Sequence, residues 1–599
     1  MPGRPELIGG FGAVSSTHWL ATGAGMAALE RGGNAFDAAV TAGFVLQVVE
    51  PHSNGFGGDV SIVLHEARPG RTAVVCGQGP MPRTATTAAF AGLGLNQIPG
   101  SGLLAACVPG AFGGWLRLLA EHGTISAADA LAPAIGYAET GFPLPADSQK
   151  AIAALVPLFA EHWPGSGRAF LHHGAAPAVG ARMRNPELAA TLRRLVAEGE
   201  QARGGRETKI EATIDAFYRG FVAEAMDGYL GRTAVLDSTG RRHRAFLRGD
   251  DLDRWHPTVE EPASLRYRDL TVHKPGPWSQ GPVFLQQLAL LEDIDLAAMD
   301  PGSGRYLHTI VESAKLAMAD REAWYGDPDF VPDRLGELLD PARIARRRAL
   351  IGEHALSDPA PSTIGGVRGW VPDVPPDEPP SFESDWMGQL QSGMPTIVLR
   401  AMVKSGDTCS VTVADRHGNL AAGVPSGGWL KSSPVIPGLG FPLGTRGQTL
   451  WLVDGHPNSL MPGKRPRTTL SPTIALRDGK PYLAFGTPGG DRQDVWTLES
   501  FLAVTEFGAD LQSATETTMF HSDHFPPSFT PRRCRPGTVV LEDNCGPEAV
   551  ADLRARGHDV ELVAPYSMGS KVCMVGVGDD GFLRAGAGPR GKQAYAICR

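Results

Sequence analysis

Residues 407–419 read DTCSVTVADRHGN and combine a strand pattern with a turn pattern. From Cys409 to Val413 every second residue is apolar, with hydroxyl residues between them, which is typical of a half-buried strand. Residues 415–419 then supply turn formers, with Gly418 available for a positive φ, and residues 420–424 read as a second short strand. The stretch therefore predicts a β-hairpin that has Thr408 at its mouth.

Four other segments combine glycine, hydroxyl and charged residues in short motifs. They are GGNAFDAAV at 32–40, NGFGGD at 54–59, KRPRTTLSPT at 464–473 and GTPGGDR at 486–492. The first opens a helix predicted over residues 35–49, which is capped by Asn34 and Asp37 and is apolar almost all round, so we expect it to be buried. The last has the pattern of a loop that enters a helix, whose first N–H groups point outward as donors.

In this order on one chain, the hairpin and these segments resemble the γ-glutamyltranspeptidase family of N-terminal-nucleophile hydrolases, from about residue 7 to the C-terminus. A threonine at the head of a strand is otherwise only a β-former, and any one of the motifs alone is a weak signal. The resemblance implies an α/β fold of the four-layer αββα sandwich type. It also implies a precursor that cuts itself between Asp407 and Thr408. The large fragment, 1–407, and the small fragment, 408–599, would then associate as one structural domain.

The same resemblance assigns the catalytic chemistry to Thr408. Its hydroxyl would be the nucleophile and its freed α-amine the base, and an amine with an ordinary pKa of about 7.7–8.0 can accept a proton near neutral pH. Ser426 corresponds to the family's second threonine, which hydrogen-bonds the nucleophile. Gly489 and Gly490 would donate backbone N–H groups to the oxyanion. Cys409 would lack the terminal amine in its own residue and is better explained as a small buried strand residue.

The predicted substrate-binding residues depart from the family pattern. Thr468 and Thr469 stand where the family has two serines that hold the substrate's α-carboxylate, so both hydroxyls are retained. Gln78 stands where the family has a carboxylate-binding arginine. The paired acids that bind the α-ammonium fall near residues 448–449, yet no Asp or Glu occurs anywhere in residues 416–453. A site without these charged partners should bind a γ-glutamyl group worse, by a factor of up to roughly 10⁴.

The segment 444–448, GTRGQ, looks more like a group of relatives that keep the catalytic residues and change the pocket. That group includes cephalosporin-acylase-like enzymes, oxamate amidohydrolases and hydrolases that cleave a carbon–carbon bond in antibiotic pathways. Arg446 either binds a carboxylate or belongs to the framework, and the sequence leaves both readings open. We therefore predict an enzyme that hydrolyses a small-molecule amide or related acyl compound through an ester on Thr408. The alternatives are a true γ-glutamyltransferase or glutathione hydrolase, a carbon–carbon bond hydrolase or acylase of a secondary-metabolite pathway, and an uncleaved scaffold.

The composition narrows the class of protein further. The 599 residues carry a net charge of −9, so no basic footprint for nucleic acid is present. No apolar run approaches the roughly 18 residues of a membrane span. The N-terminus lacks a secretion pattern and the seven cysteines are scattered and odd in number, which favours reduced thiols and a cytoplasmic location. His521 and His524 show no third ligand, so we expect neither a metal nor another cofactor. Residues 355–395, rich in proline and acids, should be extended and exposed.

Overall fold

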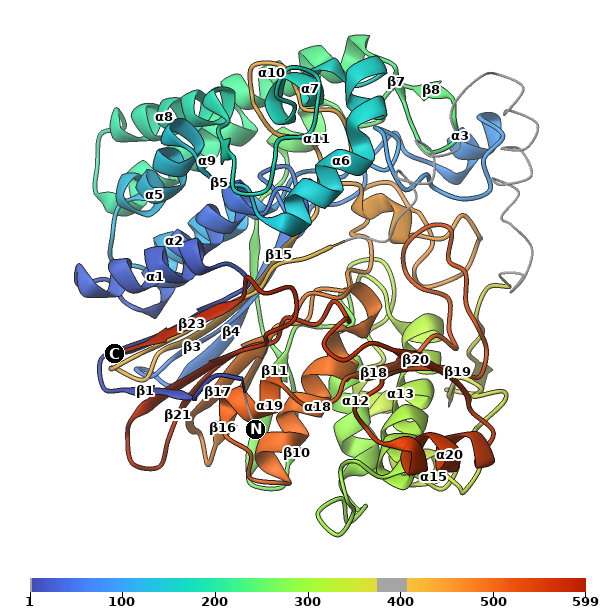
Figure 1. Ribbon diagram of the computed structural model, residues 1–599. Helices are drawn as coiled ribbons and strands as arrows, with labels where there is room; N and C mark the ends of the chain where they lie inside the picture. The colour runs from blue at the N-terminus through green and yellow to red at the C-terminus, as the bar shows by residue number, and fades with distance from the viewer. Residues whose placement is uncertain (1–2, 374–406) are drawn as a thin grey trace.

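The computed structural model of the protein describes residues 3–373 and 407–599 (Figure 1). Two seven-stranded antiparallel sheets pack against each other in its centre, and helices cover both outer faces. This arrangement is the four-layer αββα sandwich implied by the family resemblance, so that prediction is confirmed.

The first sheet contains the predicted hairpin at its centre. The register pairs Val411 with Gly423 and Ala414 with Leu420, and the turn between the two strands is the predicted one. In spatial order its strands are β23 (Tyr595–Cys598), β2 (Gly12–Ser16), β14 (Val411–Asp415), β15 (Leu420–Ser426), β3 (Asp59–Glu66), β4 (Arg71–Gly77) and β9 (Thr258–Glu260).

The second sheet lies beneath the first in the view of Figure 1. In spatial order its strands are β1 (Leu7–Gly9), β22 (Leu583–Ala587), β21 (Cys573–Val577), β17 (Lys480–Gly486), β16 (Thr473–Arg477), β11 (Leu270–Lys274) and β10 (Ala263–Tyr267). Both sheets therefore interleave strands from before and after the Asp407–Thr408 bond. A cut at this bond would leave two fragments that share each sheet.

Helices form the two outer layers. The layer over the first sheet contains α1 (Trp19–Glu30), α2 (Ala35–Val49), α4 (Ala111–His122), α5 (Ala127–Thr140), α8 (Pro186–Glu200) and α9 (Arg206–Tyr218). The layer against the second sheet contains α12 (Pro282–Leu291), α18 (Gln493–Thr505) and α19 (Leu511–Thr515). Helix α13 (Gly304–Trp324) packs on α12, and α20 (Pro547–Ala555) packs on α13. The remaining larger helices are α3 (Thr87–Gly92), α6 (Ala146–Glu161), α7 (Pro164–Phe170), α10 (Phe221–Arg232), α11 (Gly249–Asp253) and α15 (Pro341–Arg348).

Helix α2 bears out the prediction of a buried, capped helix. The Asn34 side chain accepts hydrogen bonds from the N–H groups of Phe36 and Asp37, and the Asp37 carboxylate accepts the Asn34 N–H. All fifteen residues of the helix are buried. The helix can be apolar on every side because it is covered by the first sheet on one face and by α1, α4 and α5 elsewhere.

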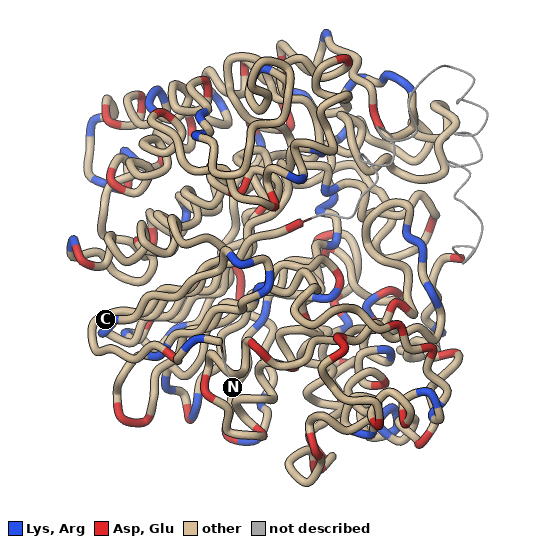
Figure 2. The backbone as a smooth tube through the Cα atoms, in the orientation of Figure 1, with Lys and Arg blue, Asp and Glu red and all other residues tan. Residues whose placement is uncertain are grey.

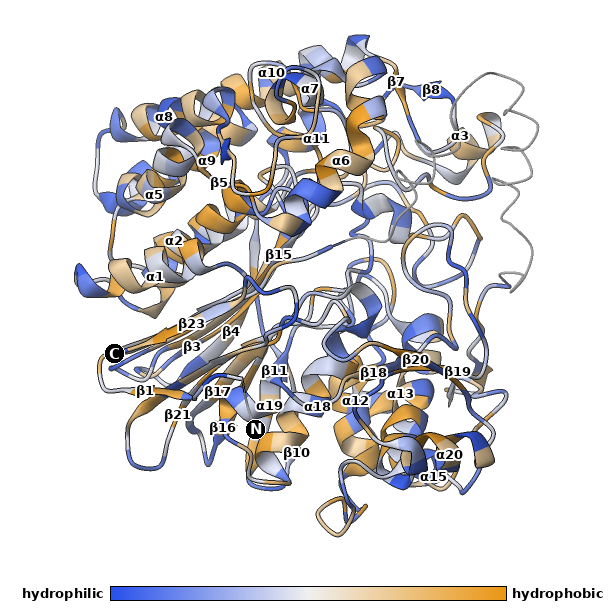
Figure 3. Cartoon of the chain, in the orientation of Figure 1, coloured by the Kyte–Doolittle hydropathy of each residue, from blue (hydrophilic) through white to orange (hydrophobic). Residues whose placement is uncertain are grey.

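Apolar residues fill the space between each pair of layers. One cluster lies between the upper helices and the first sheet, a second lies between the sheets, and a third lies between the second sheet and the lower helices. Figure 3 shows the corresponding hydrophobic colouring of the central strands. Trp115 fits between α2 and β15 because Gly43 and Gly423 carry no side chain there, and a Cβ atom on either glycine would come within 2.5 Å of its ring.

Acidic and basic residues are interspersed along the chain in both halves of the molecule (Figure 2). Across the described ranges, no helix combines the length and the hydropathy needed to cross a bilayer.

The prediction for residues 355–395 holds only in part. Ile364 is 2% exposed, and the N–H and hydroxyl of Ser362 both donate to the buried Asp320 carboxylate, so this portion is fastened to α13. A short hairpin of β12 (Thr363–Ile364) and β13 (Val367–Arg368) follows. The rest of the segment, from residue 374, lies outside the described residues.

Candidate active site

Thr408 lies just before β14 and faces the last residue of β15. A β-bridge pairs Thr408 with Ser426, and the Thr408 hydroxyl donates a hydrogen bond to the Ser426 hydroxyl over 3.2 Å. The two residues are 3% and 1% exposed. The structure thus brings together the predicted nucleophile and its predicted partner, because the hairpin folds their backbones onto one rung of the sheet.

The peptide bond before Thr408 is held by several hydrogen bonds. The Asp407 carbonyl oxygen accepts the Ser426 hydroxyl over 2.8 Å and the Trp429 indole N–H over 2.6 Å. The Thr408 N–H donates to one oxygen of the Asp407 carboxylate over 2.8 Å. The sequence analysis missed Trp429, since a tryptophan after two glycines carries no local signal of contact with a residue 22 positions earlier.

The glycine-rich loop at 54–59 explains how Ser426 and Trp429 reach this position. Gly427 and Gly428 adopt positive φ angles of 74° and 63°, which turn the chain sharply after β15. A Cβ atom on Gly58 would lie 2.1 Å from the Ser426 carbonyl oxygen, and one on Gly428 would lie 3.0 Å from the Gly58 nitrogen. The two backbones can approach this closely only because both segments are glycine.

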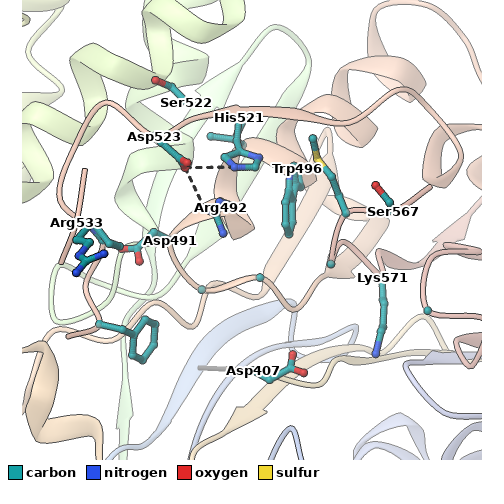
Figure 4. Close-up of a pocket in the computed structure, with 18 of the residues that line it drawn as sticks. Asp407, Asp491, Arg492, Trp496, His521, Ser522, Asp523, Arg533, Ser567 and Lys571 are labelled. Carbon is teal, nitrogen blue, oxygen red and sulfur yellow. Dashed lines mark hydrogen bonds and ion pairs between the residues drawn. The ribbon is translucent and has the colours of Figure 1, made fainter. Parts of the chain in front are cut away.

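A cavity of about 660 Å³ opens at the Asp407 side of this peptide bond. Asp407, Gly489, Gly490, Trp496 and Lys571 are among the residues that line it (Figure 4). Gly489 has a φ of 136°, and a Cβ atom there would lie 2.3 Å from the Trp496 ring. The predicted loop before a helix is present, because Gly490–Arg492 forms a 3₁₀ turn that runs directly into α18. The predicted oxyanion donors therefore lie on the wall of the cavity.

Two acidic residues of the cavity wall, Asp491 and Asp523, are neutralised by cations. Asp491 pairs with Arg321 at 2.5 Å, and Asp523 pairs with Arg492 at 2.9 Å and with Arg535 at 2.6 Å. Burial would raise the pKa of Asp523, but its hydrogen bond from His521 and the charge of Arg492 outweigh burial and hold this pKa well below its usual range.

His521 beside Asp523 is a neutral imidazole at physiological pH. Burial, reinforced by the nearby Arg492 charge, lowers the pKa of His521 to about 4 even though Asp523 acts in the opposite direction. The dashed lines of Figure 4 show how Asp523 joins His521 and Arg492 at one edge of the cavity.

Glu50, Lys571 and Asp147 form a second set of ionisable residues, close to the start of the Thr408 strand. Glu50 is fully buried and accepts hydrogen bonds from the Thr17 hydroxyl at 2.5 Å and from the Cys409 thiol at 3.1 Å. Lys571 lies 3.9 Å from Glu50 and 3.5 Å from Asp147. Burial would lower the pKa of Lys571, but the surrounding carboxylates raise it, so this lysine stays charged.

Cys409 is unsuited to act as a nucleophile. Burial, followed by the neighbouring Glu50 carboxylate, raises the pKa of its thiol well above the usual value. The thiolate, rather than the thiol, is the reactive form of cysteine. The interpretation of Cys409 as a buried strand residue agrees with its exposure of 0%.

None of the four residues predicted to bind substrate is among the described residues that line the cavity. Arg446 makes two hydrogen bonds to the Asp59 carboxylate, at 2.9 and 3.0 Å, which favours its framework reading. Gln78 donates to the Pro466 carbonyl. Thr468 forms an isolated β-bridge with Ser279, whereas the buried Thr469 hydroxyl has no hydrogen-bond partner among the described residues. Their role as substrate contacts stays a prediction.

One cluster in residues 3–373 and 407–599 has side chains spaced for a metal ion, namely His308, Glu312 and His558. The two imidazoles already hydrogen-bond each other at 2.8 Å, and Lys315 lies 2.8 Å from the Glu312 carboxylate. A lysine ammonium at this distance supplies the positive charge that a metal would otherwise supply. The cluster is best described as an internal hydrogen-bond network between α13 and the segment after α20.

Comparison with known proteins places this geometry in context. The family model for gamma-glutamyltranspeptidase matches residues 21–598. The glutathione hydrolase-like YwrD proenzyme of Bacillus subtilis (strain 168) is 29% identical over 593 residues, which cover 98% of this chain and 99% of that protein.

Two solved structures resemble the whole chain. One, titled "Structure of LmbA2991HD", is 47% identical with a TM-score of 0.91, and the match covers 100% of both chains. The cephalosporin acylase from Bacillus halodurans is 25% identical with a TM-score of 0.82, over 99% of this chain and 97% of the other. The likeness therefore extends over the sequence on both sides of the Asp407–Thr408 bond and over all four layers.

Proposed function

The chain belongs to the gamma-glutamyltranspeptidase family, and from this membership we propose that it cuts itself before Thr408 and then hydrolyses an amide through an ester on Thr408. Similar chains are named as a glutathione hydrolase-like proenzyme and as a cephalosporin acylase, which supports a self-cleaving precursor with hydrolase or acylase activity. The observation that carries the proposal is the position of the Asp407–Thr408 peptide. Its threonine hydroxyl contacts Ser426, while its aspartate lines a cavity large enough for a small-molecule substrate.

Self-cleavage would create the base as well as the nucleophile. In the uncut chain the Thr408 nitrogen is an amide, which cannot accept a proton from the hydroxyl. Once freed, the α-amine lies in the same residue as the hydroxyl and has an ordinary pKa near working pH. The precursor should therefore be inactive toward external substrates.

We propose that the two fragments stay together after the cut. Each sheet contains strands from both fragments hydrogen-bonded to one another, and the apolar cluster between the sheets contains residues of both. Separation would expose this cluster and break the strand pairing of β14 with β2 and of β15 with β3. The active enzyme would thus be a two-chain assembly of one precursor.

The preferred substrate should be an amide other than a γ-glutamyl compound. Recognition of an amino acid's α-ammonium needs a carboxylate, and in the described part of the cavity wall Asp147, Asp491 and Asp523 are each paired with a cation. Asp407 belongs to the peptide that is cut. This charge arrangement supports an acylase-like or amidohydrolase-like specificity over that of a true γ-glutamyltransferase.

The test compares wild type with Thr408→Ala and Cys409→Ala. Wild type and Cys409→Ala should each give two fragments on a denaturing gel, and the smaller wild-type fragment should begin Thr-Cys-Ser-Val. Thr408→Ala should remain one full-length band and be inactive. Cleavage of the Thr408→Ala chain would overturn the assignment of the nucleophile, and an uncut wild-type chain would favour the scaffold alternative.

The substrate is then sought with a panel of γ-glutamyl anilide, glutaryl amide and oxalyl amide compounds. We expect hydrolysis of at least one of the acyl amides at a kcat/KM well above that of the γ-glutamyl compound. A faster reaction with γ-glutamyl anilide would contradict the specificity argument while leaving the nucleophile untouched.

A further inference from the structure

The carbonyl oxygen of Asp407 lies between two hydrogen-bond donors that come from one turn of the chain. Ser426 ends β15 and Trp429 follows two glycines later, so the hydroxyl and the indole N–H converge on the same atom at 2.8 and 2.6 Å. This atom is the oxygen that would become negatively charged if the Thr408 hydroxyl attacked the peptide bond. Donors at such distances stabilise an oxyanion strongly in a site that excludes water.

We propose that Trp429 is a catalytic residue of self-cleavage, because its indole N–H and the Ser426 hydroxyl together bind the oxyanion that forms on Asp407. The inference rests on the proposed function, since it requires Thr408 to attack the bond before it. It assigns self-cleavage an oxyanion site built from two side chains, in addition to the backbone amides of Gly489 and Gly490 predicted for the substrate reaction.

The chemical step balances without any cofactor. The Thr408 Oγ1 forms a bond to the Asp407 carbonyl carbon, and the electron pair of the C=O bond moves onto the oxygen held by Ser426 and Trp429. When this pair returns, the bond between Asp407 and the Thr408 nitrogen breaks, and the proton from the hydroxyl ends on that nitrogen. Water then hydrolyses the resulting ester, which leaves a carboxylate on Asp407 and a free hydroxyl and amine on Thr408.

The indole N–H is placed to respond to the developing charge. It also lies 2.8 Å from the Ser53 carbonyl oxygen, so in the resting chain one hydrogen is shared between two acceptors. As negative charge grows on the Asp407 oxygen, the hydrogen bond to this oxygen strengthens at the expense of the neutral Ser53 carbonyl. An interaction that is stronger in the transition state than in the ground state is the kind that accelerates a reaction.

The surroundings hold the indole in this orientation. Trp429 is 2% exposed, its backbone N–H donates to the Ser432 hydroxyl, and Phe529 packs against its ring edge-to-face at 5.9 Å. The Arg446 guanidinium, which forms an ion pair with Asp59, lies 5.8 Å from the centre of the same ring. A rigid donor avoids the reorganisation that a mobile side chain would need during the attack.

The experiment measures how fast freshly purified precursor converts to two fragments on a denaturing gel. Trp429→Phe removes the N–H, and β-(benzothiophen-3-yl)alanine introduced at position 429 replaces the N–H by sulfur while it keeps the two-ring shape. Trp115→Phe is the matched control, because Trp115 is equally buried and its indole N–H has no hydrogen-bond partner among the described residues. Melting temperatures of all variants report whether folding is retained.

We expect the two position-429 variants to cleave about 10²–10³ times more slowly than wild type, which is the usual effect of losing one oxyanion donor. Trp115→Phe should cleave within about threefold of wild type. If Trp429→Phe does not fold, the benzothienyl variant decides the outcome.

A wild-type cleavage rate in a folded position-429 variant overturns the role of Trp429. Thr408→Ala separates this result from a failure of the proposed function. If Thr408→Ala stays uncut while the position-429 variants cleave normally, only the oxyanion assignment is wrong; if Thr408→Ala is cut, the nucleophile is wrong as well.

Discussion

Replacing Arg446 by methionine tests whether this residue supports the fold or contacts substrate. The side chains of Arg446 and Asp59 are 3% and 6% exposed, and two hydrogen bonds of 2.9 and 3.0 Å join them. Loss of one partner of a buried ion pair leaves the other charge uncompensated and lowers the free energy of unfolding by about 3–5 kcal/mol. With about 2.1 cal/mol/K of unfolding entropy per residue over 599 residues, the melting temperature should fall by about 2–4 °C.

The assay is thermal unfolding in the Thr408→Ala background, where the protein should remain a single chain. Arg334→Met is the matched control, because the side chains of its ion pair with Glu337 are 41% and 42% exposed and the change should cost less than about 0.5 kcal/mol. The double variant Asp59→Asn with Arg446→Met should lose less stability than the two single changes added together, since neither charge is then left alone. An unchanged melting temperature for Arg446→Met, together with a raised KM in the cleavable chain, would refute the framework reading.

Three further predictions concern Ser426, Gly58 and His52. Ser426→Ala should slow self-cleavage about 10²–10³-fold, because it removes the partner of the Thr408 hydroxyl and a hydrogen-bond donor to the Asp407 carbonyl oxygen. Ser426→Thr should cleave within tenfold of the wild-type rate, and equal cleavage rates of the alanine and threonine variants on the gel would contradict this prediction. Gly58→Ala should destabilise the protein by more than about 1 kcal/mol and slow cleavage, because the new Cβ would lie 2.1 Å from the Ser426 carbonyl oxygen. The control Gly136→Ala in α5, where a new Cβ would meet nothing within 4 Å, should stabilise the protein by about 0.5–1 kcal/mol, and the melting temperatures of the two variants measure these changes in stability. Burial lowers the pKa of His52 to about 4, so between pH 6.5 and 4 the unfolded chain binds a proton at this residue that the folded chain does not, and the free energy of unfolding decreases as the pH falls. In His52→Asn the melting temperature should therefore depend less on pH in this window, and a pH profile identical to that of wild type would contradict the prediction.

Local features of the sequence were sufficient for the elements nearest to Thr408. The alternation from Cys409 to Val413 and the turn at Gly418 predicted the hairpin, and Asn34 with Asp37 predicted the start of α2. These predictions succeeded because strand periodicity and helix capping depend on residues close together in the chain. The four layers followed from the family resemblance, which the structure and the comparisons confirmed.

The segment 355–395 shows where composition alone misleads. Proline and acidic residues predicted an exposed chain, yet Ser362 is anchored to Asp320 on α13 and Ile364 is buried. The anchor is a single buried carboxylate more than forty residues earlier, and no local pattern marks it.

Through the family resemblance, short motifs in the sequence predicted Thr408 as the nucleophile, Ser426 as its partner, and Gly489 and Gly490 as oxyanion donors. The structure places the two hydroxyls within hydrogen-bond distance and the two glycines on the cavity wall, and their catalytic roles stay predictions. Only the tertiary structure shows that Trp429 and Ser426 donate to one carbonyl oxygen and that Asp59 pairs with the guanidinium of Arg446. It also shows that Asp147, Asp491 and Asp523 on the cavity wall are each paired with a cation. The physical reason is that hydrogen bonds and ion pairs form between side chains brought together by the packing of separate layers. Their partners are set by distance in space, which the order of residues along the chain does not encode locally.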